Sequence, residues 1–136
     1  MKRYLAEMFA GSLAITLVTE LAMAFFWIRG SGKRAVEKMR EKDLGRRLLL
    51  VALVNLLTNP PAVLLCWLGR MYLPGLPEAA LQMAVEIMVV GTEAFVYCSF
   101  WEKERWRIEK PAVFAIGANV CSWLLGVFCI WIRRSL

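Results

Sequence analysis

Six polar side chains lie deep within stretches of sequence that are mostly apolar, and they are of types that bind protons or cations. They are Glu20, Glu86, Glu93, Asn55, Asn59 and Asn119. Carboxylate and amide oxygens coordinate hard cations, and carboxylates also accept and release protons. The same stretches contain no Lys, Arg, His or Asp, so no basic side chain offsets the three acidic ones. Ionisable residues in such surroundings are functional candidates by default, and these predict a site for protons or a cation.

The spacing of these residues places them on shared faces and at a shared depth. Glu86 precedes Glu93 by two helical turns and Asn59 follows Asn55 by one, so each pair faces one way. If each apolar stretch is a helix centred in a bilayer, one polar residue per helix lies about 2–6 Å to the cytoplasmic side of the centre. These four are Glu20, Asn55, Glu93 and Asn119. We expect one polar layer, with Glu86 and Asn59 lining a path toward it from outside.

Two consecutive prolines, Pro60 and Pro61, interrupt the second apolar stretch. Proline has no N–H, so the carbonyl groups of Leu56 and Leu57 lose their helical partners. Asn59 is pushed away from helical geometry by the proline that follows it. Unpaired backbone at membrane depth is tolerated only where protein or a water-filled cavity surrounds it. The sequence therefore predicts a second helix that is broken here, with freed carbonyl groups forming one wall of a binding site.

A purely structural role between helices is the alternative. Protonated Glu and Asn hydrogen-bond between membrane helices, typically at about 0.6 kcal/mol per contact. One Glu–Asn pair fits that role, but three carboxylates without a basic partner exceed what it needs, and we favour a binding site. Its predicted residues are Glu20, Asn55, Thr58, Asn59, Glu86, Glu93 and Asn119, with Glu20 and Glu93 as candidate metal ligands.

Four long apolar stretches must position these residues. The chain has 136 residues, 60% of them hydrophobic, and a mean hydropathy of +0.55. A helix needs roughly 20 mostly apolar residues to cross a bilayer. Stretches of that length are residues 5–28, 48–68, 79–100 and 111–132. The sequence therefore predicts an all-α polytopic bundle of four transmembrane helices, forming a single domain over residues 1–136.

Positive charge is shared unevenly between the two sides of this bundle. Of the 17 Lys and Arg residues, twelve fall in the connections 29–47 and 101–110, and five fall on the other side. Because Lys and Arg mark cytoplasmic loops, these connections are predicted to be cytoplasmic and both termini outside. The net charge of +6 then reflects membrane topology, and nucleic acid is not a predicted partner.

The fourth stretch carries Ala118, Ser122 and Gly126 at intervals of four. Small residues at this spacing let membrane helices approach closely, within one chain or between two. The predicted partners are therefore the lipid bilayer and either a second copy of the chain, bound through these residues, or a larger membrane complex. Cys66 and Cys129 both fall near the predicted outer face, where they either pair or pack as small apolar residues.

Three segments, VNLLTNPP, EIMVVGTE and ANVCSWLLG, carry a resemblance that covers the whole chain. Together they resemble small four-helix membrane proteins of bacteria, which implies a bacterial inner (plasma) membrane location but no activity. Residues 85–96 are also similar to the helix with two glutamates in bacterial diacylglycerol and undecaprenol kinases, where these act as base and metal ligand. Here Val89 stands where that family has Asn, the helix count differs and the charged continuation is missing.

Three functions remain open from the sequence. The first is a small transporter or channel whose polar layer binds protons or a mono- or divalent cation. The second is an intramembrane metal-dependent enzyme acting on a lipid-linked substrate, with Glu20 and Glu93 holding the metal and Glu86 acting as base. The third is an accessory subunit whose layer completes the site of a larger complex. The sequence has no His and no phosphate-binding glycine-rich loop, which favours the first function over an enzyme.

Overall fold

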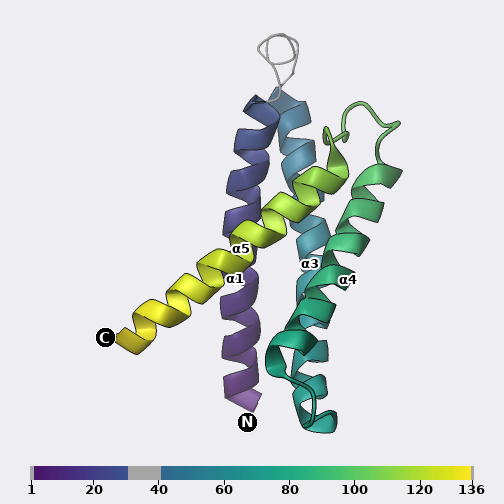
Figure 1. Ribbon diagram of the computed structural model, residues 1–136. Coiled ribbons are helices and arrows are strands. Elements are labelled where there is room, and N and C mark those ends of the chain that lie inside the picture. The colour runs from purple at the N-terminus through teal and green to yellow at the C-terminus, as the bar shows by residue number, and fades with distance from the viewer. Residues whose placement is uncertain (1, 31–40, 136) are drawn as a thin grey trace.

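The structure is a computed structural model that describes residues 2–30 and 41–135. Within these residues the chain forms four helices. They are α1 (Lys2–Gly30), α3 (Glu41–Tyr72), α4 (Glu78–Ser99) and α5 (Pro111–Ser135). Each contains a stretch long and apolar enough to cross a membrane. The predicted all-α bundle of four such helices is therefore confirmed (Figure 1).

The helices extend beyond the boundaries that the apolar stretches predict. α3 begins at Glu41, seven residues before the predicted start at Leu48, so part of the predicted connection 29–47 is helical. Lys, Arg and Glu are good helix formers, and a change in hydropathy marks the edge of the apolar surface but not the end of the helix. Residues 31–40 of that connection lie outside the described residues.

The predicted break in the second helix is wrong, because α3 is one continuous helix with Pro60 and Pro61 inside it. The fixed φ of proline suits a helix, and the two rings remove only the N–H groups that Leu56 and Leu57 would have used. Ending the helix here would unpair further backbone groups, each of which costs several kcal/mol at membrane depth. Continuing the helix through both prolines has the lower cost.

The four helices form a ring in which each contacts two neighbours. α1 packs against α3 and α5, and α4 packs against the same two helices. Figure 1 shows α5 crossing the others obliquely, with its C-terminal half leading away from α4. Among the side chains of α5 that the structure describes, the buried ones lie in its first half; they are Phe114, Ala115, Ala118 and Asn119. The bundle is therefore tightly packed at one end and opens toward the other.

The packed end lies beside residues 100–110, and we call it the Ile108 end. Ile108, Phe114 and Tyr97 are each at most 1% exposed there. The ring of Phe114 lies 5.5 Å from that of Tyr97 and 6.0 Å from that of Trp27, measured between ring centroids. We call the opposite end, where α3 turns into α4, the Arg70 end. Among the side chains that the structure describes, the apolar core cluster thus includes the Ile108 end of the bundle.

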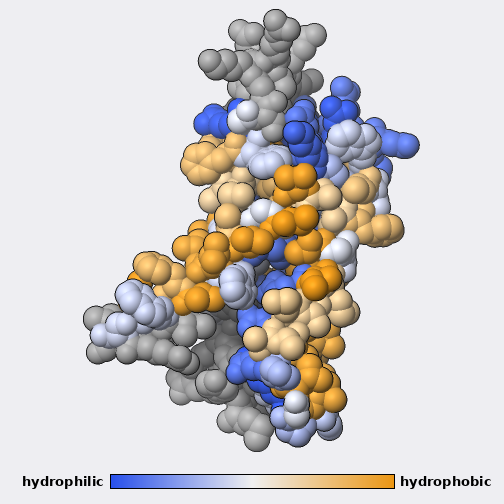
Figure 2. Space-filling view, in the orientation of Figure 1, coloured by the Kyte–Doolittle hydropathy of each residue, from blue (hydrophilic) through white to orange (hydrophobic). Residues whose placement is uncertain are grey.

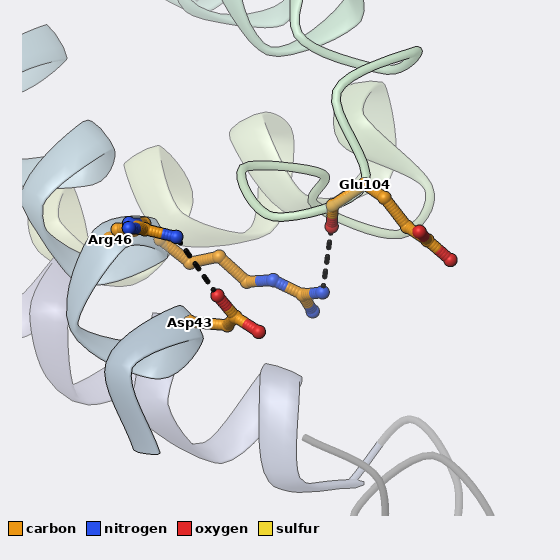
Figure 3. A network of polar contacts seen from close by, with 4 residues as sticks. Asp43, Arg46 and Glu104 are labelled. Carbon is orange, nitrogen blue, oxygen red and sulfur yellow. Dashed lines mark hydrogen bonds and ion pairs between the residues drawn. The ribbon is translucent and has the colours of Figure 1, made fainter. Parts of the chain in front are cut away.

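Hydrogen bonds fasten residues 100–110 onto the Ile108 end. The guanidinium of Arg47 donates to the carbonyl oxygen of Glu104 at 3.2 Å, and the indole N–H of Trp27 donates to that of Glu109 at 2.9 Å. Figure 3 shows this corner, where Arg46 also pairs with Asp43 at 3.3 Å. These contacts tie α1 and α3 to the segment that precedes α5, so this end is held closed.

Large apolar side chains cover much of the outer surface of the bundle. Val18, Phe26 and Phe95 are 70%, 71% and 73% exposed. An apolar surface of this extent is unusual on a protein in water and is what a lipid bilayer solvates. Together with four helices of spanning length, it makes this chain a multi-pass membrane protein.

Candidate functional site

Glu20 of α1 and Asn55 of α3 form a buried pair, and both side chains are 0% exposed. The amide nitrogen of Asn55 donates to Oε2 of Glu20 at 2.7 Å and to the carbonyl oxygen of Val51 at 3.1 Å. Val51 lies one turn earlier on α3, so its carbonyl group and the carboxyl group of Glu20 together use both amide hydrogens of Asn55. The orientation of this amide is therefore fixed by two bonds.

Glu93 of α4 has a hydrogen-bond partner on each carboxyl oxygen. Asn119 of α5 donates to Oε2 at 2.5 Å, and the hydroxyl of Thr58 on α3 lies 3.0 Å from Oε1. Thr58 has one hydroxyl hydrogen but two acceptors, because the carbonyl oxygen of Val54 also lies 3.0 Å away. If that hydrogen goes to Val54, a proton on Glu93 can complete the bond to Thr58. The arrangement therefore accommodates Glu93 with or without a proton.

These two groups together connect all four helices. Glu20 links α1 to α3, Thr58 links α3 to α4, and Asn119 links α4 to α5. Glu20, Asn55, Glu93 and Asn119, which were expected to share one layer, are each at most 5% exposed. We call them, with Thr58, the polar layer. The structure brings these residues together, and their role in binding stays a prediction.

Two oxygen atoms of the polar layer have no donor. Oε1 of Glu20 and Oδ1 of Asn55 are buried and have no hydrogen-bond partner among the described residues. A buried acceptor in this state costs about 1–3 kcal/mol. Across the same part of the chain, no Lys or Arg is hydrogen-bonded to Glu20 or Glu93. The polar layer is therefore acidic and short of both donors and positive charge.

A cavity of about 870 Å³ opens at the Arg70 end and reaches the polar layer. The layer residues that line it are Asn55, Thr58, Glu93 and Asn119. Arg70 and Glu78, which form an ion pair, line its mouth. Figure 2 shows hydrophilic residues inside the hollow between α4 and the diverging half of α5. The cavity thus ends at the polar layer, with the apolar core beyond it.

The predicted path residues Glu86 and Asn59 both line this cavity. Glu86 is half-buried and lies two turns from Glu93 toward the mouth. The amide of Asn59 donates to the hydroxyl of Thr16 on α1 at 3.0 Å. Glu20 is the exception among the predicted site residues, because it does not line the cavity. It is hydrogen-bonded to Asn55, which does line the cavity.

The freed backbone carbonyls do not form a wall of this cavity, so that expectation is wrong. Leu56 and Leu57, which carry them, are 56% and 62% exposed, and neither lines the cavity. Residues 56 and 57 lie about 100° and 200° around the helix from Asn55, on the side facing away from the other helices. The prolines and the site residues share a segment of sequence but occupy different faces of α3.

The small residues of α5 face the interior of this chain. Ala118 is 0% exposed, and Ser122 and Gly126 line the cavity. Their spacing therefore serves packing and cavity width within one chain, and a homodimer through them stays a prediction. Cys66 and Cys129 are free thiols that also line the cavity, so no disulfide joins them.

The candidate metal ligands Glu20 and Glu93 have separate hydrogen-bond partners. Among the described residues, no three His, Cys, Asp or Glu side chains come close enough together to hold a metal ion. A divalent cation such as Ca²⁺ takes six to eight oxygen ligands, several of them from carboxylates. The arrangement suits a proton or a singly charged cation better.

Tyr97 is a residue of this region that sequence reasoning missed. It lies one turn after Glu93 on the same face of α4 and is 0% exposed. Its hydroxyl group has no hydrogen-bond partner within the described part of the chain. The interval of four residues after a buried glutamate was the available indication, but an aromatic residue near a helix end also reads as an interface anchor.

No family model, curated protein or solved structure matches this chain. The geometry of the polar layer and of the cavity above it is therefore the basis for a functional conclusion.

Proposed function

We propose that this chain is a small transporter of the bacterial plasma membrane whose polar layer binds protons or a cation. One observation carries the proposal: a cavity ends at the buried carboxyl group of Glu93 and the unsatisfied amide oxygen of Asn55, and Asn55 is hydrogen-bonded to the buried carboxyl group of Glu20. Supplying a proton or a cation would offset the shortage of donors and of positive charge at once. A purely structural layer has no need of access from the membrane surface.

The distribution of Lys and Arg indicates which side the cavity faces. The connections richest in positive charge lie at the Ile108 end, so the Arg70 end faces outward on this reasoning. A cation entering from outside passes the Arg70–Glu78 pair, then Glu86, and reaches Glu93. The apolar core then blocks further movement.

A closed far end favours a carrier over a channel. Tyr97, Phe114 and Ile108 fill the space beyond the polar layer in this conformation. Release toward the cytoplasm requires the Ile108 end to open while the Arg70 end closes. The enzyme alternative has less support, because Glu20, its proposed metal ligand, does not face the cavity.

Reconstituted vesicles with an internal pH indicator test this proposal directly. An imposed cation or proton gradient should produce flux with the wild type, and Glu93→Gln or Glu20→Gln should reduce it at least tenfold. Glu102→Gln is the matched control, since Glu102 is exposed in the 100–110 segment and does not line the cavity. Wild-type flux in both layer variants would refute the proposal.

A further inference from the structure

The walls of the cavity combine aromatic and aliphatic side chains with carboxylates, and this combination narrows the class of ligand. Trp67 of α3 and Trp123 of α5 line it. Aliphatic side chains also contribute to the wall; among them are Ile15, Ala62, Val63, Val85, Val89 and Val127. A bare inorganic ion gains nothing from such walls. A ligand with an apolar body gains from removing both surfaces from water.

Among the carboxylates of the described residues that line the cavity, one is available to a ligand. Arg70, the one basic residue among the described residues that line it, pairs with Glu78 at the mouth. Glu93 is bonded by Thr58 and Asn119. Glu86 has neither a hydrogen bond nor an ion pair with any described residue and is half-buried. Among these described lining residues an anion would find no free positive charge, whereas a cation finds Glu86.

The distances of Glu86, Trp123 and Trp67 from the polar layer, measured along their helices, suit a ligand whose positive charge lies between aromatic surfaces. Glu86 lies seven residues from Glu93, or about 10 Å along the helix axis, and Trp123 lies four residues from Asn119, or about 6 Å. Trp67 lies nine residues beyond Thr58, or about 14 Å. The carboxylate therefore lies at a height between those of the two indole rings. A positive charge held by Glu86 can have aromatic surface on either side.

We propose that the cavity binds a hydrophobic organic cation carrying a single positive charge, with the charge at Glu86 and the apolar body against Trp67 and Trp123. This inference rests on the proposed function and names the class of its substrate. The volume of the cavity, about 870 Å³, lies within the range of about 300–1,000 Å³ that is typical of cavities enclosing drug-sized ligands. A divalent metal ion fits poorly, because it would need several more oxygen ligands than Glu86 supplies.

Two probes of the same shape and opposite charge give a sharp test. Tetraphenylphosphonium and tetraphenylborate each place four phenyl rings around a single charge. Equilibrium dialysis against the purified full chain in detergent should show saturable binding of the phosphonium, with the borate binding at least tenfold more weakly. Equal binding of both ions would overturn the proposal, because it would indicate nonspecific partition into apolar surface.

Variants then assign the binding to the cavity. Glu86→Gln should weaken phosphonium binding at least tenfold, and Trp123→Leu should weaken it about three- to tenfold. The controls are Glu102→Gln and Trp131→Leu, because Trp131 is 63% exposed and does not line the cavity. Neither control should change the affinity. Unchanged binding in Glu86→Gln, with normal thermal stability of that variant, would overturn the proposal.

The outcome also separates this inference from the function on which it rests. Proton or sodium flux that depends on Glu93, without phosphonium binding, would overturn the substrate class and leave the proposed transporter intact. Absence of both flux and binding would overturn the two together. Phosphonium binding that depends on Glu86, accompanied by uptake into vesicles that depends on Glu93, would support both.

Discussion

Asn55 holds Glu20 by a single carboxyl oxygen, leaving the other oxygen of Glu20 and the amide oxygen of Asn55 without donors. Both amide hydrogens of Asn55 are used, one by Glu20 and one by Val51. The pair therefore cannot satisfy itself by rotating the amide. A proton bound by Glu20, or a cation lying between the oxygens, supplies what is missing.

Replacing one member of this pair should lower the free energy of unfolding more than replacing both members. Asn55→Leu leaves both oxygens of Glu20 without a donor and should destabilise the protein by about 1–3 kcal/mol. Adding Glu20→Leu replaces the pair by apolar groups and should restore most of that loss, since such double replacements are nearly neutral. Thermal unfolding in detergent measures both effects.

Transport by the double variant distinguishes function from packing. We expect Glu20→Leu/Asn55→Leu to be stable and inactive in the vesicle assay. The control Thr92→Val removes a hydroxyl that bonds only to the carbonyl oxygen of Met88 on the exposed face of α4. It should stay within about 0.5 kcal/mol of the wild type and remain active. An active double variant would contradict a functional role for the pair.

Protons and an organic cation should compete for the acidic residues of the cavity. If each bound cation displaces one proton, the apparent Kd for tetraphenylphosphonium rises tenfold for each unit that the pH falls, in the range where the carboxyl group is protonated. At higher pH the Kd becomes constant. Glu86→Gln should remove this dependence, and dialysis at several pH values measures it. A Kd that stays constant at every pH would argue against competition.

Cys66 offers a test of orientation, because it is a free thiol lining the cavity. In a chain whose other three cysteines are replaced by Ala, a membrane-impermeant cationic methanethiosulfonate added to intact cells should label Cys66. Tetraphenylphosphonium should slow the labelling. Glu102→Cys in a cysteine-free chain is the matched control and should react only after the cells are permeabilised. Labelling of Glu102→Cys in intact cells, with Cys66 labelled only after permeabilisation, would show that the topology is the reverse of the predicted one.

Two glycines should respond oppositely to the same substitution. A Cβ at Gly69 would lie 2.5 Å from Cδ2 of Leu81, whereas a Cβ at Gly91 would meet no atom within 4 Å. Gly91→Ala should stabilise α4 by about 0.5–1 kcal/mol. Gly69→Ala should be less stable than Gly91→Ala by about 1–3 kcal/mol, because Leu81 must move. Adding Leu81→Ala to Gly69→Ala should relieve the clash, and apparent melting temperatures in detergent record the comparison.

The layer was predictable because it depends on two regular quantities. The rise per residue and the periodicity of an α-helix place Glu20, Asn55, Glu93 and Asn119 at a common depth once the apolar stretches are recognised. Their burial then follows, since polar groups at that depth avoid lipid. Hydrogen bonds among them belonged to the structural alternative, and the sequence could not show which amide meets which carboxyl group.

The cavity and the continuous α3 were not predictable in the same way. The oblique path of α5 depends on which side chains meet at Phe114, Ala115 and Ala118, and crossing angles vary widely for similar sequences. The behaviour at Pro60 depends on a comparison of backbone costs, in which the membrane penalises a broken helix more heavily than water does. The low helix propensity of proline therefore led to the wrong prediction of a break at Pro60 and Pro61.

Because α5 runs obliquely away from α4, a small rotation of its C-terminal half moves the end of the helix by a large distance. The last described buried residues of α5 are Ala118 and Asn119, and seventeen residues, or about 25 Å of helix, extend from Ala118 to Ser135. Rotating such a rod by about 10° about Ala118 displaces its tip by about 4 Å, while atoms at the pivot hardly move. An angular change small enough to leave the hydrogen bonds of Asn119 intact would therefore change the width of the cavity entrance by about 4 Å.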